Sequence, residues 1–280
     1  MLRAGCIEAA QSTNLHKQPA QLRSVNQQDS GFRKGISVRR ITELPELESL
    51  QIEGISFFDP FLKQFALETM LSGGEVHVAQ SGGGNIGGML LYDDIEKAGS
   101  IFTRSGETLE ALFKLKEKMV FFSELQLELR KEDYLIYTID MTGCSFSHRF
   151  SHEVSVAGED DMADVLGLMT SSYSRINTRW IKIAIAAGEK CFIVRTHNGI
   201  EGVAWLSVVG GKGRLHSLVV SPQFRKQGVG TDLLFARLLW LRAIGGRFAF
   251  SEIAESNRHS RAIALSGGMR ESGVMYQYRS

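Results

Sequence analysis

The residues best suited to chemistry form one short run, Arg225 to Gly230, which reads RKQGVG. An apolar, strand-like run from Leu215 to Val220 precedes it, and a leucine-rich helical run from Thr231 to Ile244 follows. Glycines lack the Cβ atom that keeps backbone N–H groups away from phosphate oxygens, and a helix N-terminus adds the positive end of its dipole. The run therefore predicts an anion-binding site at a strand-to-helix junction, suited to an oligophosphate.

Length and composition limit the class of protein. The chain has 280 residues, of which 43% are hydrophobic and 9% aromatic, enough for one large or two ordinary domains with a real core. Its apolar runs are shorter than the roughly 20 residues that a membrane span needs, and the polar residues 1–34 lack the apolar centre of a secretory signal. We expect a cytoplasmic protein with no membrane association.

Cysteine spacing and charge exclude further classes. Cys6, Cys144 and Cys191 lie far apart without a C-x-x-C pair, so we expect neither a disulfide framework nor a metal site. The formal net charge is +1, so nucleic acid is not an expected partner. Residues 152–280 carry 16 Lys and Arg against 11 Asp and Glu, so the anion-binding run lies in the basic half.

An order of elements occurs twice, about 114 residues apart, and this predicts two copies of one domain. Gly74-Glu75 recurs as Gly188-Glu189, and Ile86 recurs as Ile200 at the same offset. The first copy is expected to have strands at 36–41, 75–80, 88–92 and 134–141 and helices at 43–55 and 60–71. The second is expected to have strands at 153–156, 191–196, 202–209, 215–220, 248–253 and 273–278 and helices at 160–172, 178–187, 231–244 and 258–265.

The two copies differ at the anion-binding run. At the equivalent place, residues 105–116, the first copy has a single glycine before a helical pattern, so a phosphate cradle is not expected there. We interpret this as one working and one degenerate copy. The expected division is an extension at 1–34 that is disordered or loosely packed, a degenerate domain at 35–142, a linker at 143–151 and a working domain at 152–280.

A second glycine motif matches a dinucleotide-binding fingerprint. Gly82, Gly84 and Gly87 satisfy G-x-G-x-x-G, the dinucleotide fingerprint, after a predicted strand. That fingerprint must open a helix, whereas residues 88–92 have a strand pattern. We predict a hairpin turn, and Asn198-Gly199 in the second copy is the strongest short signal for one.

Two segments resemble a known family. Leu218 to Gly230, LVVSPQFRKQGVG, resembles motif A of the GCN5-related N-acetyltransferases (GNAT), and Asn257 to Met269 resembles their motif B. The resemblance covers residues 152–280 in element order and residues 36–141 more weakly. It implies an α/β fold of two GNAT-like domains, each a mixed, mostly antiparallel central sheet flanked by helices. Splayed parallel strands would form the acyl-CoA cleft in the C-terminal domain.

The same resemblance implies acetyl-CoA as co-substrate. Its pantetheine would pair with the motif A strand, and its pyrophosphate would lie over the backbone N–H groups of the loop. For Asn257, an ordinary helix N-cap is an equally good interpretation. The cofactor-binding residues implied in this way are Leu218, Val219, Val220, Arg225, Lys226, Gln227, Gly228, Val229, Gly230, Thr231 and Asn257.

The implied reaction is direct attack of an amine on the thioester, with a backbone N–H near Leu218 as the oxyanion donor. Many family members have a tyrosine as the acid for the thiolate, but Ala264 occupies that position here, so Tyr276, Tyr278, Ser260 or water would have to replace it. The base used by the histone-acetylating branch falls on Arg214, so that mechanism does not carry over.

Candidate bases are Glu252, Glu255 and His216. Each has a simpler alternative, namely pairing of Glu252 with an arginine, a solvated helix-start charge at Glu255 and a satisfied core histidine at His216.

The acceptor is expected to be a small-molecule or protein amine. Tyr173, Arg175 and Trp180 lie where the family recognises its acceptor, although a solvated helix start explains them as well. A homodimer is one expected assembly. Two further hypotheses stay open: a non-catalytic acyl-CoA-binding regulatory or scaffolding protein, and an acyltransferase with a different acyl donor.

Overall fold

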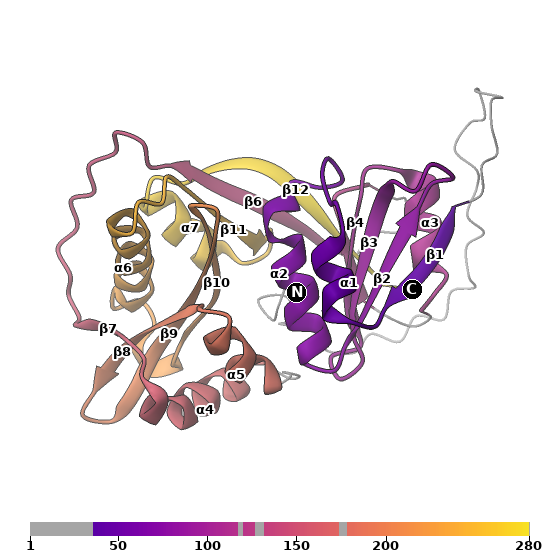
Figure 1. Ribbon diagram of the computed structural model, residues 1–280. Helices are drawn as coiled ribbons and strands as arrows, with labels where there is room; N and C mark the ends of the chain where they lie inside the picture. Colours follow the sequence, from indigo (N-terminus) through magenta and orange to yellow (C-terminus); the bar gives the residue numbers. More distant parts are fainter. Residues whose placement is uncertain (1–35, 117–119, 127–131, 174–177, 280) are drawn as a thin grey trace, which may run out of the picture.

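The computed structural model describes residues 36–116, 120–126, 132–173 and 178–279. The expected extension at 1–34 lies outside these residues. Through the described part runs one twelve-stranded sheet in the order β1-β2-β3-β4-β5-β12-β6-β11-β10-β9-β8-β7, with helices on both faces (Figure 1). No described helix combines the length and apolar character needed to cross a bilayer.

The first half of the chain supplies strands β1 to β6 and helices α1 to α3. Their bounds are β1 Ser37–Ile41, α1 Leu44–Ser49, α2 Asp59–Leu71, β2 Glu75–Gln80, β3 Ile86–Asp93, β4 Ala98–Thr103, α3 Gly106–Phe113, β5 Val120–Ser123 and β6 Glu132–Asp140.

The second half supplies the remaining strands and helices. Their bounds are β7 Val154–Val156, α4 Met162–Ser172, α5 Arg179–Ala186, β8 Lys190–Thr196, β9 Gly199–Val209, β10 Lys212–Val220, α6 Val229–Ala243, β11 Phe248–Ala254, α7 Arg258–Ser266 and β12 Arg270–Arg279.

The last strand of each half is exchanged with the other half. β6, from the first half, lies between β11 and β12 and pairs antiparallel with both. β12, from the second half, pairs antiparallel with β5 as well as with β6. Each half is therefore completed by a strand of the other, and β6 and β12 lie together at the centre of the sheet.

Each half contains one parallel strand pair in an otherwise antiparallel arrangement. β4 pairs parallel with β5, and β10 pairs parallel with β11. The predicted fold class, a mixed and mostly antiparallel α/β architecture repeated twice, is confirmed. The sequence patterns did not indicate β4, β5 or the exchange of the terminal strands.

The two faces of the sheet carry different helices. In the first half, α2 packs on Val76 and Val78, whereas α3 packs on the opposite face with Ala79. In the second half, α4 and α5 cover one face, and α6 and α7 cover the other. Because α2 also contacts α5, these two helices share a face and meet over the junction between the halves.

Aromatic residues within and just before α2 pack across the junction between the two halves. Phe250 of β11 contacts the rings of Phe57, Phe58 and Phe61 edge to face, with centroids 5.1 to 5.5 Å apart. Such pairs add about 0.5–1.5 kcal/mol each beyond the apolar area they bury. The first half thereby becomes part of the structure around β11.

Both predicted hairpin turns are present. Between β2 and β3, Ser81 N–H donates to the Asn85 carbonyl at 3.0 Å, and Gly84 has a φ of +81°. Gly199, between β8 and β9, has a φ of +117°. The G-x-G-x-x-G run is thus a hairpin turn and opens no helix.

Residues 143–151, the expected linker, contain no helix or strand and are held to α6. The buried carboxylate of Asp232 accepts from His148 Nε2 at 2.7 Å and from the His152 backbone N–H at 3.0 Å, and its other side-chain contact is with His152 Nδ1 at 2.8 Å. This contact attaches the linker beside the first turn of α6.

The exchange predicts that the second half does not fold alone. Residues 152–280 without β6 would expose the facing edges of β11 and β12, and unpaired edges favour aggregation. We expect this fragment to lack a cooperative thermal transition by circular dichroism and to recover one when co-expressed with residues 36–151. A fragment that melts cooperatively near the melting temperature of the whole chain would contradict the dependence on β6.

Candidate functional site

The candidate site lies where two parallel strands separate. β10 and β11 pair only from Lys212 to Arg214 and from Phe248 to Phe250. Beyond these residues a cavity of about 80 Å³ opens between them, with Leu218 on one side and Ala254 on the other. The predicted cleft between splayed strands is present in the second half.

A β-bulge in β10 shapes the wall of this cavity. The register with β9 runs regularly to His216 and resumes at Val219, so that Ser217 and Leu218 leave the ladder. Ser217 has a φ of +50°, a left-handed conformation that costs a non-glycine residue on the order of 1–2 kcal/mol. The bulge frees the backbone of Leu218 at the cavity wall, where an oxyanion donor was predicted.

The predicted anion-binding run begins with an exposed turn, Arg225 to Gly228, that precedes α6. Gly228 caps the helix with a φ of +91°, and Lys226 has a φ of +63°. Asp232 N–H is the first to donate back along the helix, to the Gly228 carbonyl at 2.9 Å. The amides of the preceding residues thus have no acceptor in the helix and suit an anion.

Gly230 has a packing role that the sequence did not indicate. It is buried, and a Cβ atom there would lie 2.7 Å from Ile263 Cδ1 of α7. Its small size lets α6 and α7 pack closely. Gly228, in contrast, is exposed, with the nearest side-chain atom, Ser151 Oγ, 3.8 Å from the position of a Cβ atom.

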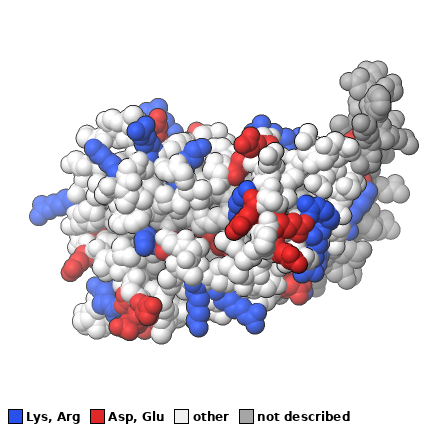
Figure 2. All heavy atoms as spheres, viewed as in Figure 1, with Lys and Arg blue, Asp and Glu red and all other residues white. Residues whose placement is uncertain are grey.

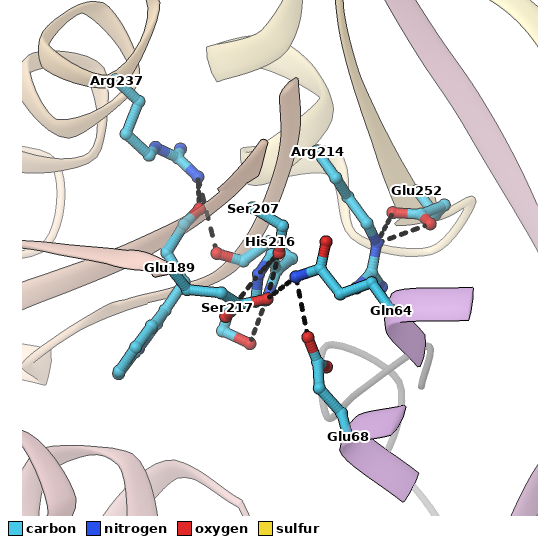
Figure 3. A network of polar contacts seen from close by, with 10 residues as sticks. Gln64, Glu68, Glu189, Ser207, Arg214, His216, Ser217, Arg237 and Glu252 are labelled. Carbon is cyan, nitrogen blue, oxygen red and sulfur yellow. Dashed lines mark hydrogen bonds and ion pairs between the residues drawn. The ribbon is translucent and has the colours of Figure 1, made fainter. Parts of the chain in front are cut away.

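A chain of polar side chains leads from the bulge into the protein interior (Figure 3). His216 Nδ1 lies 3.1 Å from Ser217 Oγ, and its Nε2 lies 3.1 Å from Ser207 Oγ and 3.4 Å from Glu189 Oε2. Ser207 Oγ in turn donates to Glu189 Oε1. Burial, followed by the charge of Arg214, holds the pKa of His216 well below its ordinary value. The imidazole is therefore neutral at pH 7.

Glu252 is engaged in a buried ion pair. Arg214 Nε donates to Glu252 Oε1 at 3.0 Å and to Oε2 at 3.3 Å. The guanidinium of Arg214 also lies 4.9 Å from the ring centroid of Phe65 in α2. Glu252 lines the cavity, as expected of a candidate base. Both its oxygens nevertheless accept from Arg214, which agrees with the alternative interpretation of Glu252 as an ion-pair partner of an arginine.

The first half of the chain contributes to the same polar network. Gln64 and Glu68 project from α2 toward His216 and Glu189 (Figure 3). Gln64 Nε2 donates to Glu68 Oε1 at 2.8 Å and to Glu189 Oε1 at 3.5 Å. The deep end of the network is therefore built from both halves.

The structure brings some of the other predicted residues to the cavity. Tyr173, at the end of α4, lines it. Asn257 lines it as well, while its side-chain oxygen accepts from Ser260 N–H at 3.1 Å, so Asn257 is an N-cap that faces the cleft. Arg225, whose Nε donates to the Val220 carbonyl at 3.2 Å, remains exposed on the turn.

Other predicted residues lie elsewhere. Tyr276 packs in the apolar cluster around α3 with Phe121 and Tyr278, in the first half, and does not line the cavity. Trp180 is buried against Trp205, with ring centroids 4.9 Å apart, as a core residue. Arg175 lies outside the described residues.

The sequence patterns missed several members of the site. Ser207, Ser217 and Arg237 showed no motif, because their proximity depends on the bulge and on the packing of α6. Glu189 did recur in the repeat as the counterpart of Glu75, but that match indicated a repeated fold and no chemistry.

On the molecular surface, acidic and basic side chains are interspersed over the face shown in Figure 2.

Comparison with known proteins shows which family residues 162–266 resemble. Residues 162–266 match the model of the acetyltransferase (GNAT) family. This range contains the splayed strands, the bulge and the exposed turn. The matched part of the chain is thus similar in sequence to a GNAT domain. No curated protein matches the sequence.

Solved structures extend the fold similarity to most of the chain. A Drosophila protein is 14% identical with a TM-score of 0.60 and covers 88% of this chain and 99% of its own. A tandem GNAT protein from the clavulanic acid biosynthesis pathway is 14% identical with a TM-score of 0.56, over 88% of this chain and 98% of its own. An acetyltransferase of the GNAT family from Colwellia psychrerythraea is 13% identical with a TM-score of 0.55, over 87% and 99%. At these identities the likeness shows the fold, which is that of two GNAT-like domains.

The buried imidazole predicts a pH-dependent stability. Between the lowered pKa of folded His216 and the ordinary value near 6.5, the unfolded chain binds a proton that the folded chain does not. The free energy of unfolding therefore falls as pH drops below about 6.5, with a slope from this group approaching about 1.4 kcal/mol per pH unit. Urea unfolding of the wild type and of His216→Gln at several pH values measures it; parallel curves would contradict the expectation.

Proposed function

We propose that the chain is an acetyl-CoA-dependent N-acetyltransferase whose one working cleft lies in the second half. The observation that carries the proposal is the exposed turn at Lys226 to Gly228, whose backbone amides precede α6. Two residues further on, a Cβ atom at Gly230 would lie 3.7 Å from the side chain of Leu218, which lines the cavity. Backbone amides at a helix N-terminus, with nearby cations, suit the pyrophosphate of CoA. The family match over residues 162–266 supports the same activity.

The first half is, in this proposal, a degenerate copy, and the domain boundaries remain those expected at 35–142 and 152–280. Its parallel strands β4 and β5 also pair over only three residues each. There, however, Ser105 caps α3 with its side chain, which accepts from Thr108 N–H at 3.3 Å. This hydrogen bond occupies an amide that a phosphate would need, so the first half supports the cleft of the second and binds no CoA of its own.

The acetyl group would lie at the bulge, between the two faces of the sheet. The thioester carbonyl accepts from the backbone N–H of Leu218, which is outside the β9–β10 ladder. The amine acceptor enters from the face of α2, α4 and α5, where Tyr173 lines the cavity. The amine nitrogen then attacks the carbonyl carbon directly.

His216 is the proposed base, acting through Ser217. The neutral imidazole accepts the proton that the amine loses, passed on by the Ser217 hydroxyl 3.1 Å away. Glu189, 3.4 Å from Nε2, stabilises the imidazolium that forms. Glu252 keeps Arg214 in place as its ion-pair partner and is not required to accept the proton.

A second candidate function is binding of an acyl-CoA without turnover. It is favoured by Ala264, which lines the cavity where many family members have an acidic tyrosine. A different acyl donor is the third possibility that the sequence left open. Sustained release of CoA thiol with any amine of a panel, above hydrolysis, separates an enzyme from a pure binder.

Charge reversal on the turn tests the CoA site. Lys226→Glu should weaken acetyl-CoA binding about tenfold or more, because it removes a cation and adds an anion beside the phosphates. Lys212→Glu, equally exposed but at the opposite end of β10, should leave affinity unchanged. Isothermal titration calorimetry measures both; equal loss in the two variants would mean a general charge effect and contradict the site.

The proposed base is tested by kinetics. His216→Gln should lower kcat for CoA release about 100-fold while acetyl-CoA affinity stays near the wild-type value, because only proton transfer is removed. His197→Gln, at the exposed β8–β9 turn, is the matched control and should retain full activity. If His216→Gln retained the wild-type kcat, His216 would not be the base.

A further inference from the structure

Arg237 is a buried cation on the otherwise apolar inner side of α6. Its neighbours along that side include Leu233, Leu234 and Leu238, and only 3% of Arg237 is exposed. The residue lines the cavity between β10 and β11, together with Ala264 and the bulge.

The contacts of Arg237 are with backbone carbonyls. Nε donates to Leu233 O at 3.1 Å, and Nη1 donates to Trp205 O at 3.1 Å and to His216 O at 3.5 Å. Within the described part of the chain it forms no ion pair with a carboxylate. Burial lowers the pKa of Arg237 to about 9, so the guanidinium is still charged at pH 7.

A charge in such a place needs an explanation beyond packing. Burying an ion without a counter-charge costs several kcal/mol, and a neutral amide could donate to carbonyls equally well. The cost is offset if an anion enters the cavity during function. Because Arg237 lines the cavity, we assign that anion to the ligand of the cleft.

The position of Arg237 along α6 indicates which part of the ligand carries the negative charge. Arg237 follows Gly230 by seven residues, which is about 10 Å of helix, so the pyrophosphate at the exposed turn is out of its reach. It donates instead to the carbonyl of His216, the residue before the bulge. The nearby part of a bound acyl-CoA is the thioester.

We propose that Arg237 stabilises the negative charge that develops on the thioester and then on the departing sulfur. This inference rests on the proposed function. As the amine nitrogen bonds to the carbonyl carbon, the oxygen becomes negative; as the C–S bond breaks, its electron pair stays on the sulfur of CoA. The amine proton goes to His216 through Ser217, and the thiolate leaves paired with Arg237. It later receives, through water, the proton that His216 releases. A fixed cation thereby replaces the acid that is missing at Ala264.

The ionisation of the CoA thiol, which the reaction releases, can be measured without knowing the amine acceptor. The thiol of CoA bound to the wild type is titrated by the ultraviolet absorbance of the thiolate, with the desulfo-CoA complex as the blank. The bound thiol should have a pKa about one unit or more below that of free CoA. Arg237→Lys, which keeps the charge, should retain most of this shift, and Arg237→Gln, which keeps a donor, should lose it.

Desulfo-CoA also serves as the folding control, because it lacks only the sulfur and should bind all three proteins equally. The wild-type titration stands even if a variant fails to fold. CoA that binds the wild type with an unshifted thiol would overturn the role of Arg237 and leave the proposed function intact, whereas absence of CoA binding would overturn both. A shift equal in Arg237→Gln and the wild type would also overturn it. Binding of malonyl-CoA gives a further check. If the wild type binds malonyl-CoA tenfold more tightly than acetyl-CoA and Arg237→Gln does not, Arg237 recognises a charged acyl group, which would also overturn the proposed role.

Discussion

The antiparallel pairing of β6 with β12 is the constraint on which the rest of the structure depends. Each of these strands comes from one half of the chain and completes the sheet of the other. β6 holds β11 along seven residue pairs, from Phe248 to Ala254, whereas β10 is bound to β11 over only three. β11 therefore follows its exchanged partner, and β10, which pairs with β9, diverges from it. The cleft is the consequence of a strand with two competing neighbours.

The exchange also decides what surrounds the cleft. It places α2 of the first half over β11, where Phe61 contacts Phe250, and brings Gln64 and Glu68 to the network around His216. The opposite face holds α6, with the exposed turn at its start and Arg237 further along. Acyl-CoA and amine would thus approach from opposite faces and meet at the bulge, with a neutral imidazole on one side and a cation on the other. The first half, which we propose binds no CoA, has a structural role in this arrangement.

Local features of this architecture could be predicted from the sequence, and long-range ones could not. The hairpins at Gly84 and Gly199, the repeat and the strand–turn–helix around Gly228 depend on neighbouring residues, and each was predicted within a few positions. The partner of β6 could not be, because an apolar strand such as 132–140 carries no record of which edge it pairs with. For the same reason Tyr276 was expected near the cleft but lies around α3, and no sequence pattern indicated Arg237. The side chains around His216 meet only because a bulge, a helix of each half and a hairpin converge.

We propose that this chain binds acyl-CoA in one cleft only, at the exposed turn before α6. Amide hydrogen exchange of the whole chain, with and without acetyl-CoA, tests it most directly, since the method reports both halves at once. We expect new protection at residues 225–231 and at Leu218, with exchange at residues 103–113 of the first half unchanged. Protection at Ser105 to Phe113, or none at the turn before α6 under saturating acetyl-CoA, would contradict it.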